Sequence, residues 1–321
     1  MDGDMASNFF ITHFFNPPRY LKLVEIVSHS SNSKNLLNDL VFFLKEKAGK
    51  GVVFAKDSPN FIANRIGVYG MMVILNETIN MNMSVEDVDS LTGPLIGRPK
   101  SATFRTADIV GLDVLSFVLS TAYEKCINDP EREMFKLPDF VKNMISNNML
   151  GQKSGSGFYK KVSKGKIYSI DLKTLEYKPI SKKRYTGIRK AKEYISLDRR
   201  ISTLLNSDDI AGQFTWRVIS KVINYTASIY GEISDDIYSI DNAMKWGFGW
   251  EMGPFEIWDA IGFYKVYKKL EKDKFEIPIW IQDIKDKSTF KFYRKEKGEL
   301  LTYSPNEQLY KVSSKSLAFN L

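Results

Sequence analysis

An internal repeat constrains the fold of this 321-residue chain more than any other feature of its sequence. Each copy has an arginine 24 residues before an aspartate, and an Asp-x-x-Gly step follows. The equivalent residues, about 152 positions apart, are Arg65 and Arg217, Asp89 and Asp241, Asp108 and Asp259, and Gly111 and Gly262. Ser84 and Asp236 stand five residues before the first aspartate of each copy, where they are expected to cap a helix. The repeat therefore predicts two tandem helical domains.

The residues before the first copy have the pattern of a mixed α/β segment. Two apolar runs, NFFITHFF (8–15) and LKLVEIV (21–27), flank the turn NPPR (16–19), and its prolines end the first run. Apolar residues at helical spacing follow in 32–49, and VVFAK (52–56) predicts another strand. This segment is short for an independent α/β domain, so we expect it to be the end of one.

The expected fold class is therefore mainly α, with a remnant α/β segment in front. Ser58 as N-cap and Pro59 at the first helical position predict a helix that runs to about Asn80. Residues 166–180 predict a short β-hairpin or an extended linker. The expected domains are a truncated α/β segment at 1–56, a first helical domain at 57–160, a basic linker at 161–198, a second helical domain at 199–300 and a tail at 301–321.

Charge and composition exclude several classes of protein. The net charge is +8, but the lysines alternate with acidic residues, as in KVYKKLEKDKFEIP (265–278), which is typical of a solvated helix face. A nucleic-acid binder is disfavoured, because no basic stripe with interleaved aromatic residues occurs. A single cysteine, Cys126, rules out an intrachain disulfide, and two histidines leave little for a metal site. No apolar run reaches the about 18 residues of a membrane helix, and the N-terminus does not resemble a signal peptide. We expect no membrane association and a cytoplasmic setting.

Two positions in the predicted strands can carry chemistry. Alternation puts His13 on one face with Ile11 and Phe15, and it puts Glu25 among apolar neighbours. Taken alone, His13 also fits a core histidine, and Glu25 fits an exposed strand end or a loop cap. Strands joined by a short turn lie side by side, which would bring His13 and Glu25 together. A carboxylate beside a histidine is the pair that orients a general base.

Two further positions are candidates for a site. Asn64 lies on the apolar side of the predicted helix, and the second copy has Trp216 in its place. An asparagine that only one copy keeps favours a site role over a purely structural hydrogen bond. GQKSGSGFY (151–159) places three glycines around Lys153, which fits either an approaching anion or a plain loop. The chain contains no dinucleotide-binding or phosphate-loop fingerprint.

These residues lie in long motifs that resemble the (S)-3-hydroxyacyl-CoA dehydrogenases of fatty acid β-oxidation. The motifs are THFFNPPRYLKLVEIV (12–27), KDSPNFIANRIG (56–67), GRPKSATFRTADIVGLD (97–113) and GQKSGSGFYKK (151–161). A fifth, SIDNAMKWGFGWEMGPFEIWDAIG (239–262), resembles the repeated C-terminal domain of the long forms. The resemblance covers about residues 9–300 and implies that the front segment is the end of a Rossmann-like, NAD-binding domain.

The resemblance implies a role for each candidate residue. It implies that His13 is the catalytic base on the 3-hydroxyl, that Glu25 is its partner and that Asn64 holds the substrate oxygen. Lys153 would lie near the nicotinamide end of NAD, which takes the hydride from C3. The implied reaction is the oxidation of an (S)-3-hydroxyacyl-CoA to a 3-oxoacyl-CoA. The doubled helical domain implies a pseudo-dimer within one chain, and hence a monomer.

The chain departs from the family pattern at both ends. Relatives begin with a Gly-rich strand–turn–helix that binds the dinucleotide, which is absent here. We therefore expect the chain to lack the N-terminal NAD-binding half, which a separate polypeptide would supply. The long forms continue into a hydratase domain, for which the final residues 316–321 leave no room, so hydratase activity is not expected. The alternative is an inactive truncated remnant or a helical scaffold without catalysis.

Overall fold

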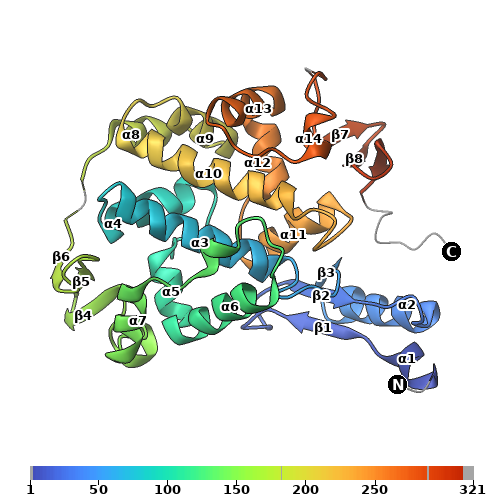
Figure 1. The fold of residues 1–321 in the computed structure, drawn as a ribbon, viewed down its shortest axis with the longest axis horizontal. Coiled ribbons are helices and arrows are strands. Elements are labelled where there is room, and N and C mark those ends of the chain that lie inside the picture. Colours follow the sequence, from blue (N-terminus) through green and yellow to red (C-terminus); the bar gives the residue numbers. More distant parts are fainter. Residues whose placement is uncertain (1–2, 182, 288, 314–321) are drawn as a thin grey trace. The chain divides into compact units, whose positions relative to one another are not determined.

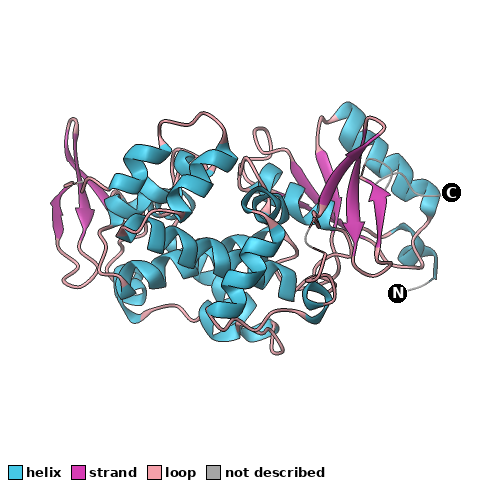
Figure 2. Cartoon of the chain, turned by 90° about the horizontal axis from the view of Figure 1, so that it is seen from above, coloured by secondary structure: helices cyan, strands magenta, loops and turns pink. Residues whose placement is uncertain are grey.

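A computed structural model describes residues 3–181, 183–287 and 289–313 of the chain (Figure 1). It divides into two compact units: unit 1 comprises Met1–Arg65 and Thr226–Leu321, and unit 2 comprises Ile66–Tyr225. About half of the described residues lie in helices, and the strands form small three-stranded sheets (Figure 2). The fold is a mixed α/β fold rich in helices, so the predicted mainly α class is confirmed only in part.

Unit 1 begins with a small sheet covered by one helix. Its first elements are α1 (Gly3–Asn8), β1 (Ile11–Phe14), β2 (Leu23–Val27), α2 (Lys34–Phe42), the π-helical turn η1 (Phe43–Lys47) and β3 (Gly51–Phe54). The strand order is β1–β2–β3, with β1 antiparallel and β3 parallel to β2. Ser33 caps α2 by accepting a hydrogen bond from the backbone N–H of Leu36. Apolar side chains of α2 and η1 pack on the sheet in a core of Val24, Ile26, Leu37, Val41, Leu44 and Val52.

The second repeat completes unit 1. Its elements are α11 (Ile237–Gly247), α12 (Pro254–Ile261), α13 (Phe263–Lys272), α14 (Ile279–Gln282), β7 (Tyr293–Glu296), β8 (Glu299–Ser304) and β9 (Leu309–Val312). Helix α11 packs against β2 and β3. The approach is close, since a Cβ added to Gly51 would lie 2.3 Å from the Trp246 ring, and one added to Gly247 would lie 2.7 Å from Leu23. The second repeat therefore supports the sheet formed by the N-terminal segment.

Unit 2 contains most of the first repeat, the segment that follows it and the beginning of the second repeat. Its elements are α3 (Ala63–Asn80, from Ile66 on), α4 (Val85–Thr92), η2 (Pro94–Ile96), α5 (Phe104–Val110), α6 (Leu112–Lys125), η3 (Arg132–Phe135), α7 (Asp139–Ser146), η4 (Gln152–Ser154), β4 (Tyr159–Ser163), β5 (Lys166–Ile170), β6 (Tyr177–Pro179), α8 (Thr186–Ala191), α9 (Leu197–Leu205) and α10 (Ile210–Ser228, up to Tyr225). The long helices α3 and α10 run antiparallel. Tyr69 stacks on Tyr225 with ring centroids 3.7 Å apart, and Glu77 pairs with Lys221 at 2.7 Å.

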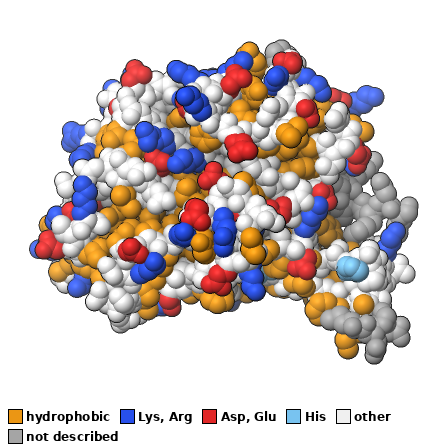
Figure 3. All heavy atoms as spheres, viewed as in Figure 1, with side chains coloured by type: hydrophobic (Ala, Val, Ile, Leu, Met, Phe, Trp, Pro, Cys, Tyr) orange, Lys and Arg blue, Asp and Glu red, His pale blue; other side chains and the backbone are white. Residues whose placement is uncertain are grey.

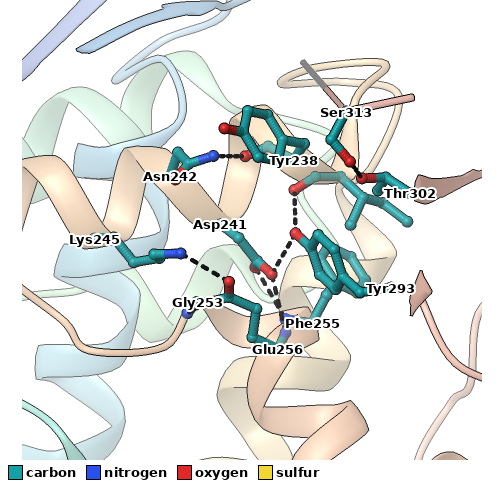
Figure 4. Close-up of polar contacts among 11 residues, drawn as sticks. Tyr238, Asp241, Asn242, Lys245, Gly253, Phe255, Glu256, Tyr293, Thr302 and Ser313 are labelled. Carbon is teal, nitrogen blue, oxygen red and sulfur yellow. Dashed lines mark hydrogen bonds and ion pairs between the residues drawn. The ribbon is translucent and has the colours of Figure 1, made fainter. Parts of the chain in front are cut away.

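The two copies of the repeat form the same hydrogen-bond network, each in its own unit. In each copy the first aspartate accepts a tyrosine hydroxyl at 2.8 Å, and the second accepts the backbone N–H of the same tyrosine. The members are Asp89, Asp108 and Tyr159 in unit 2, and Asp241, Asp259 and Tyr293 in unit 1, where Figure 4 shows the Asp241–Tyr293 contact. Burial raises the pKa of Asp89, Asp108 and Asp259 to about 6. Burial, and the nearby Glu256 charge, raise the pKa of Asp241 well above its ordinary value.

Several local predictions can be compared with the structure. Ser84 and Asp236 cap α4 and α11 as expected, since the side chain of each accepts backbone N–H groups of its helix. The predicted hairpin in 166–180 is confirmed, and β4 extends it to three strands. The helix expected from Ser58 instead begins at Ala63. Where a tail was expected, β8 and β9 extend to Val312, and residues 314–321 lie outside the described residues.

Charges of both signs are mixed on the surface. Figure 3 shows basic and acidic side chains intermingled over the face in view. Among the described residues no single helix is long and apolar enough to cross a membrane, although α5 and α6 together, with a 95° bend between them, meet the criteria of length and composition. Within the same residues no cluster of histidine, cysteine, aspartate and glutamate could hold a metal ion.

Candidate active site

His13 and Glu25 face each other across the antiparallel strands β1 and β2. They are direct partners in the register of this pair. The Nδ1 atom of the imidazole lies 2.7 Å from Oε2 of the carboxylate. The Glu25 side chain is fully buried, whereas 31% of the His13 side chain is exposed. The short turn between the strands therefore produces a pair with its acid inside the protein and its base at the surface.

The carboxylate of Glu25 is held by the beginning of α3 as well. Its Oε1 accepts the backbone N–H groups of Ile62 at 3.0 Å and of Ala63 at 2.9 Å. The first N–H groups of a helix have no partner within the helix and carry partial positive charge, so they stabilise an anion. These hydrogen bonds, together with that to His13, offset the cost of burying a carboxylate in an apolar sheet.

The contact with Glu25 sets the tautomer of His13. A carboxylate only accepts hydrogen bonds, so Nδ1 carries the proton and the lone pair of the neutral ring lies on Nε2. The rings of Phe15 and Phe61 flank the imidazole, with centroids 5.0 and 5.6 Å from it. The pair can accept a proton at Nε2, because the buried carboxylate stabilises the imidazolium that results.

The turn before α3 gives these N–H groups their direction. Asn60 and Phe61 have φ angles of 66° and 48°, in the left-handed region that non-glycine residues rarely adopt. The backbone N–H of Phe61 donates to the carbonyl of Ser58 at 3.0 Å, which closes the turn. This left-handed turn delays the helix from Ser58 to Ala63, and that delay points the N–H groups of Ile62 and Ala63 at Glu25. The sequence analysis missed these groups, and an asparagine, which tolerates this conformation, was the only local signal.

The remaining predicted residues lie in two different places. Asn64 is partly buried in the first turn of α3, directly after Ala63 and in the same unit as His13. Lys153 lies in unit 2, in the short helix η4, and pairs with Asp113 at 2.6 Å. This contact lowers the pKa of Asp113. The structure thus brings His13 and Glu25 together and places Asn64 on the adjoining helix, while Lys153 belongs to the other unit.

Two of the three glycines around Lys153 are explained by packing. A Cβ added to Gly151 would lie 2.3 Å from the backbone oxygen of Asp108, and one added to Gly157 would lie 2.1 Å from its carboxylate. Gly155 has φ of 79° and open space around it. The segment therefore needs glycine mainly to approach Asp108, whose carboxylate accepts the backbone N–H of Phe158 at 2.8 Å.

Comparison with known families identifies the class of protein that carries this site. The model of the 3-hydroxyacyl-CoA dehydrogenase C-terminal domain matches residues 61–161 and again 212–292. The model of the 3-hydroxyacyl-CoA dehydrogenase NAD binding domain matches residues 3–58. The chain belongs to the 3-hydroxyacyl-CoA dehydrogenase family. The predicted family and the predicted repeat of its C-terminal domain are confirmed.

Individual relatives agree with this assignment. The chain is 46% identical over 304 residues to a probable 3-hydroxyacyl-CoA dehydrogenase of Bacillus subtilis, which covers 95% of this chain and 38% of the relative. It is 45% identical over 158 residues to a protein of the same description from Deinococcus radiodurans, covering 49% of this chain and 45% of that one. The chain thus spans less than half the length of these relatives. Its fold is similar to that of 3-hydroxybutyryl-CoA dehydrogenase from Escherichia coli K12, with a TM-score of 0.58 over 86% of this chain and 70% of that one, at 16% identity.

These findings correct three predictions and confirm one. The expectation that the chain lacks the NAD-binding half is wrong, because the NAD binding domain model matches residues 3–58. For the same reason a truncated Rossmann remnant and a separate NAD-binding polypeptide are not supported. The absence of the glycine fingerprint was therefore not sufficient to exclude this domain. The expected cofactor, NAD, is confirmed as that of the matched domain.

We tested whether the glycines of this segment fit the phosphates of NAD. After α1, the glycines of residues 3–58 are Gly49 and Gly51. Gly49 has φ of 64° and follows η1, and Gly51 is required by the ring of Trp246. Gly49 lies between a helix and the strand β3, and Gly51 is the first residue of β3. This order is the reverse of the strand–turn–helix order that presents N–H groups to a pyrophosphate. We therefore assign no residue of this segment to the phosphates.

Proposed function

We propose that the protein carrying this chain oxidises the 3-hydroxyl group of an (S)-3-hydroxyacyl-CoA to a ketone, with NAD as oxidant. The observation that carries the proposal is the contact between His13 Nδ1 and Glu25 Oε2 at 2.7 Å, with the acid buried and the base half-exposed. Membership of the family supports the acyl-CoA substrate. The net charge of +8 favours a ligand rich in phosphate, as coenzyme A is.

In this proposal each residue has one task. His13 takes the proton of the substrate hydroxyl on Nε2, and Glu25 stabilises the imidazolium and keeps Nδ1 protonated. NAD, when bound, supplies the acceptor for the hydride that leaves C3. The amide of Asn64 donates to the substrate oxygen and thereby orients it. The resemblance to the family implies that Lys153 would supply a positive charge to the nicotinamide end of NAD.

The test compares the two histidines of the chain in the protein that carries it. His13→Gln is expected to lower kcat for NADH oxidation with acetoacetyl-CoA by about 10²–10⁴-fold, the usual contribution of a general acid or base. His29→Gln is the matched control, because His29 is exposed and bonds only locally, to Ser31 at 2.8 Å. An active His13→Gln protein would remove His13 from the reaction. An inactive wild-type protein that still folds would favour the alternative, an inactive helical scaffold.

The doubled helical domain also supports a monomeric chain, in which the second copy takes the place of a partner subunit. Both copies keep the same aspartate–tyrosine network, which supports a second copy that is built like the first. Light scattering after gel filtration of the protein that carries this chain is expected to give the mass of one copy of that protein. Twice that mass at all concentrations would contradict the proposal.

A further inference from the structure

We propose that Arg65 is a positioning residue for the His13–Glu25 pair, and that Glu232 of the second repeat is its ion-pair partner. The proposal rests on the proposed function of His13. It assigns to the second repeat a task beyond packing, because Glu232 lies 167 positions away in the sequence.

Arg65 is completely buried, which is costly for a charge unless its surroundings hold it. Its guanidinium donates to the carbonyl of Pro59 at 3.3 Å and to Oε1 of Glu232 at 3.0 Å. A guanidinium is a rigid planar fork, so contacts on two sides fix the groups that it joins relative to each other. Here it joins the turn before α3 to the segment before α11.

The turn that Arg65 contacts is strained. Asn60 and Phe61, both left-handed, directly follow Pro59. Such a conformation persists only where the surrounding structure holds it. Arg65 provides two of the holding contacts, since its backbone N–H also donates to the carbonyl of Asn60 at 3.3 Å. The arginine therefore closes the turn on itself and attaches it to the second repeat.

The turn reaches the catalytic pair by two routes. Ile62 and Ala63, which follow it directly, donate the N–H groups that hold Oε1 of Glu25. The ring of Phe61 lies 5.6 Å from the imidazole of His13. A shift of the turn would therefore rotate the carboxylate of Glu25. It would also change the packing around the imidazole of His13, which this carboxylate orients.

The second repeat holds the same region at neighbouring points. The backbone N–H of Lys56 donates to the carbonyl of Ile233 at 2.9 Å, and the Ser234 hydroxyl donates to the carbonyl of Phe54 at 3.1 Å. Lys56 also pairs with Asp235 at 2.8 Å. Glu232 thus belongs to a short segment that is attached to the end of β3, so its carboxylate is held in place for Arg65.

The repeat supplies a matched control. Arg217 is the equivalent of Arg65, and it pairs with Glu77 at 3.2 Å within unit 2. Its side chain is 52% exposed, whereas that of Arg65 is fully buried. A general effect of replacing arginine in this repeat would therefore appear in both, and a positioning effect only at Arg65.

The experiment uses Arg65→Lys, Glu232→Gln and the control Arg217→Lys. Nitrogen-15 NMR of the histidine rings reports the tautomer, and the chain has two histidines, with exposed His29 as internal reference. Arg65→Lys and Glu232→Gln are expected to move the ring signals of His13 and to lower kcat by up to about 10²-fold with little change in KM, as for a misplaced catalytic group. Arg217→Lys is expected to change neither.

Two results would overturn the proposal: unchanged His13 signals in folded Arg65→Lys or Glu232→Gln, or equal changes in all three variants. If Arg65→Lys does not fold, Glu232→Gln decides alone, because 44% of the Glu232 side chain is exposed. The NMR measurement does not need turnover, so it separates this proposal from the proposed function. If His13→Gln did not reduce activity, the proposed function would be wrong. The NMR result on the position of the His13 ring would still stand.

Discussion

Replacing Glu25 by glutamine or by alanine separates the two tasks of its carboxylate. Glutamine keeps a carbonyl oxygen for the N–H groups of Ile62 and Ala63, and its NH₂ group then faces Nδ1 of His13. In the reverse orientation the NH₂ group of the glutamine would face the N–H groups of Ile62 and Ala63, which are also donors. The side-chain amide therefore has one favourable orientation. Alanine removes the acceptor for both N–H groups as well as the partner of His13.

The loss of stability in each variant follows from the number of groups that lose a hydrogen-bond partner. The glutamine variant loses one hydrogen bond to a charged group, worth about 1.5–3 kcal/mol. The alanine variant also leaves two N–H groups buried without an acceptor, at about 1–3 kcal/mol each. We therefore expect Glu25→Ala to be less stable than Glu25→Gln by about 2–6 kcal/mol.

Urea unfolding followed by tryptophan fluorescence measures this difference. Four of the five tryptophans, at positions 246, 250, 258 and 280, lie in unit 1 with Glu25, so the signal reports mainly on that unit. With a urea dependence of about 2 kcal/mol per molar, the midpoints of the two variants should differ by about 1–3 M. The glutamine variant should in addition move the ring proton of His13 from Nδ1 to Nε2 in nitrogen-15 spectra.

Equal midpoints for the two variants would refute the reasoning, because the N–H groups of Ile62 and Ala63 would then not depend on Glu25. An unchanged His13 tautomer in Glu25→Gln would show that the carboxylate does not set the ring. Either result would also remove the physical basis for Arg65 as a positioning residue.

Three further predictions concern packing, the repeat network and pH. Gly51→Ala should lower the free energy of unfolding by about 1–3 kcal/mol in urea, because its Cβ would meet the Trp246 ring, and an unchanged midpoint would contradict that packing. Tyr159→Phe and Tyr293→Phe should each lower the free energy of unfolding by about 1.5–3 kcal/mol, because each loses the hydrogen bond from the tyrosine hydroxyl to an aspartate carboxylate. Wild-type stability in both variants would mean that the aspartate–tyrosine network does not stabilise the fold. Burial raises the pKa of Asp108 to about 6, above its unfolded value, so its contribution to stability should fall by about 2 kcal/mol as pH rises from 4 to 7. Asp108→Asn should flatten this pH dependence in unfolding experiments, and an unchanged slope would contradict the raised pKa.

Local patterns in the sequence determined much of what the structure contains. Alternation along two strands with a proline turn between them predicted that His13 and Glu25 lie together, and the register places them opposite each other. Ser84 and Asp236 predicted two helix starts, because a cap acts on N–H groups two or three residues away. The repeat was likewise evident from residue types at fixed spacing, and the family from long motifs that resemble those of known members.

Tertiary structure decided what depends on residues far apart in the chain. The helix expected at Ser58 begins at Ala63, since the buried Arg65 and the carboxylate of Glu25 favour a left-handed turn over an earlier helical one. The pairing of Arg65 with Glu232, and the packing of Trp246 on Gly51, join segments that no local pattern relates. Helix capping and strand alternation depend on residues a few positions apart. Burial of a charge and close packing against a glycine depend on which distant segment the fold brings into contact.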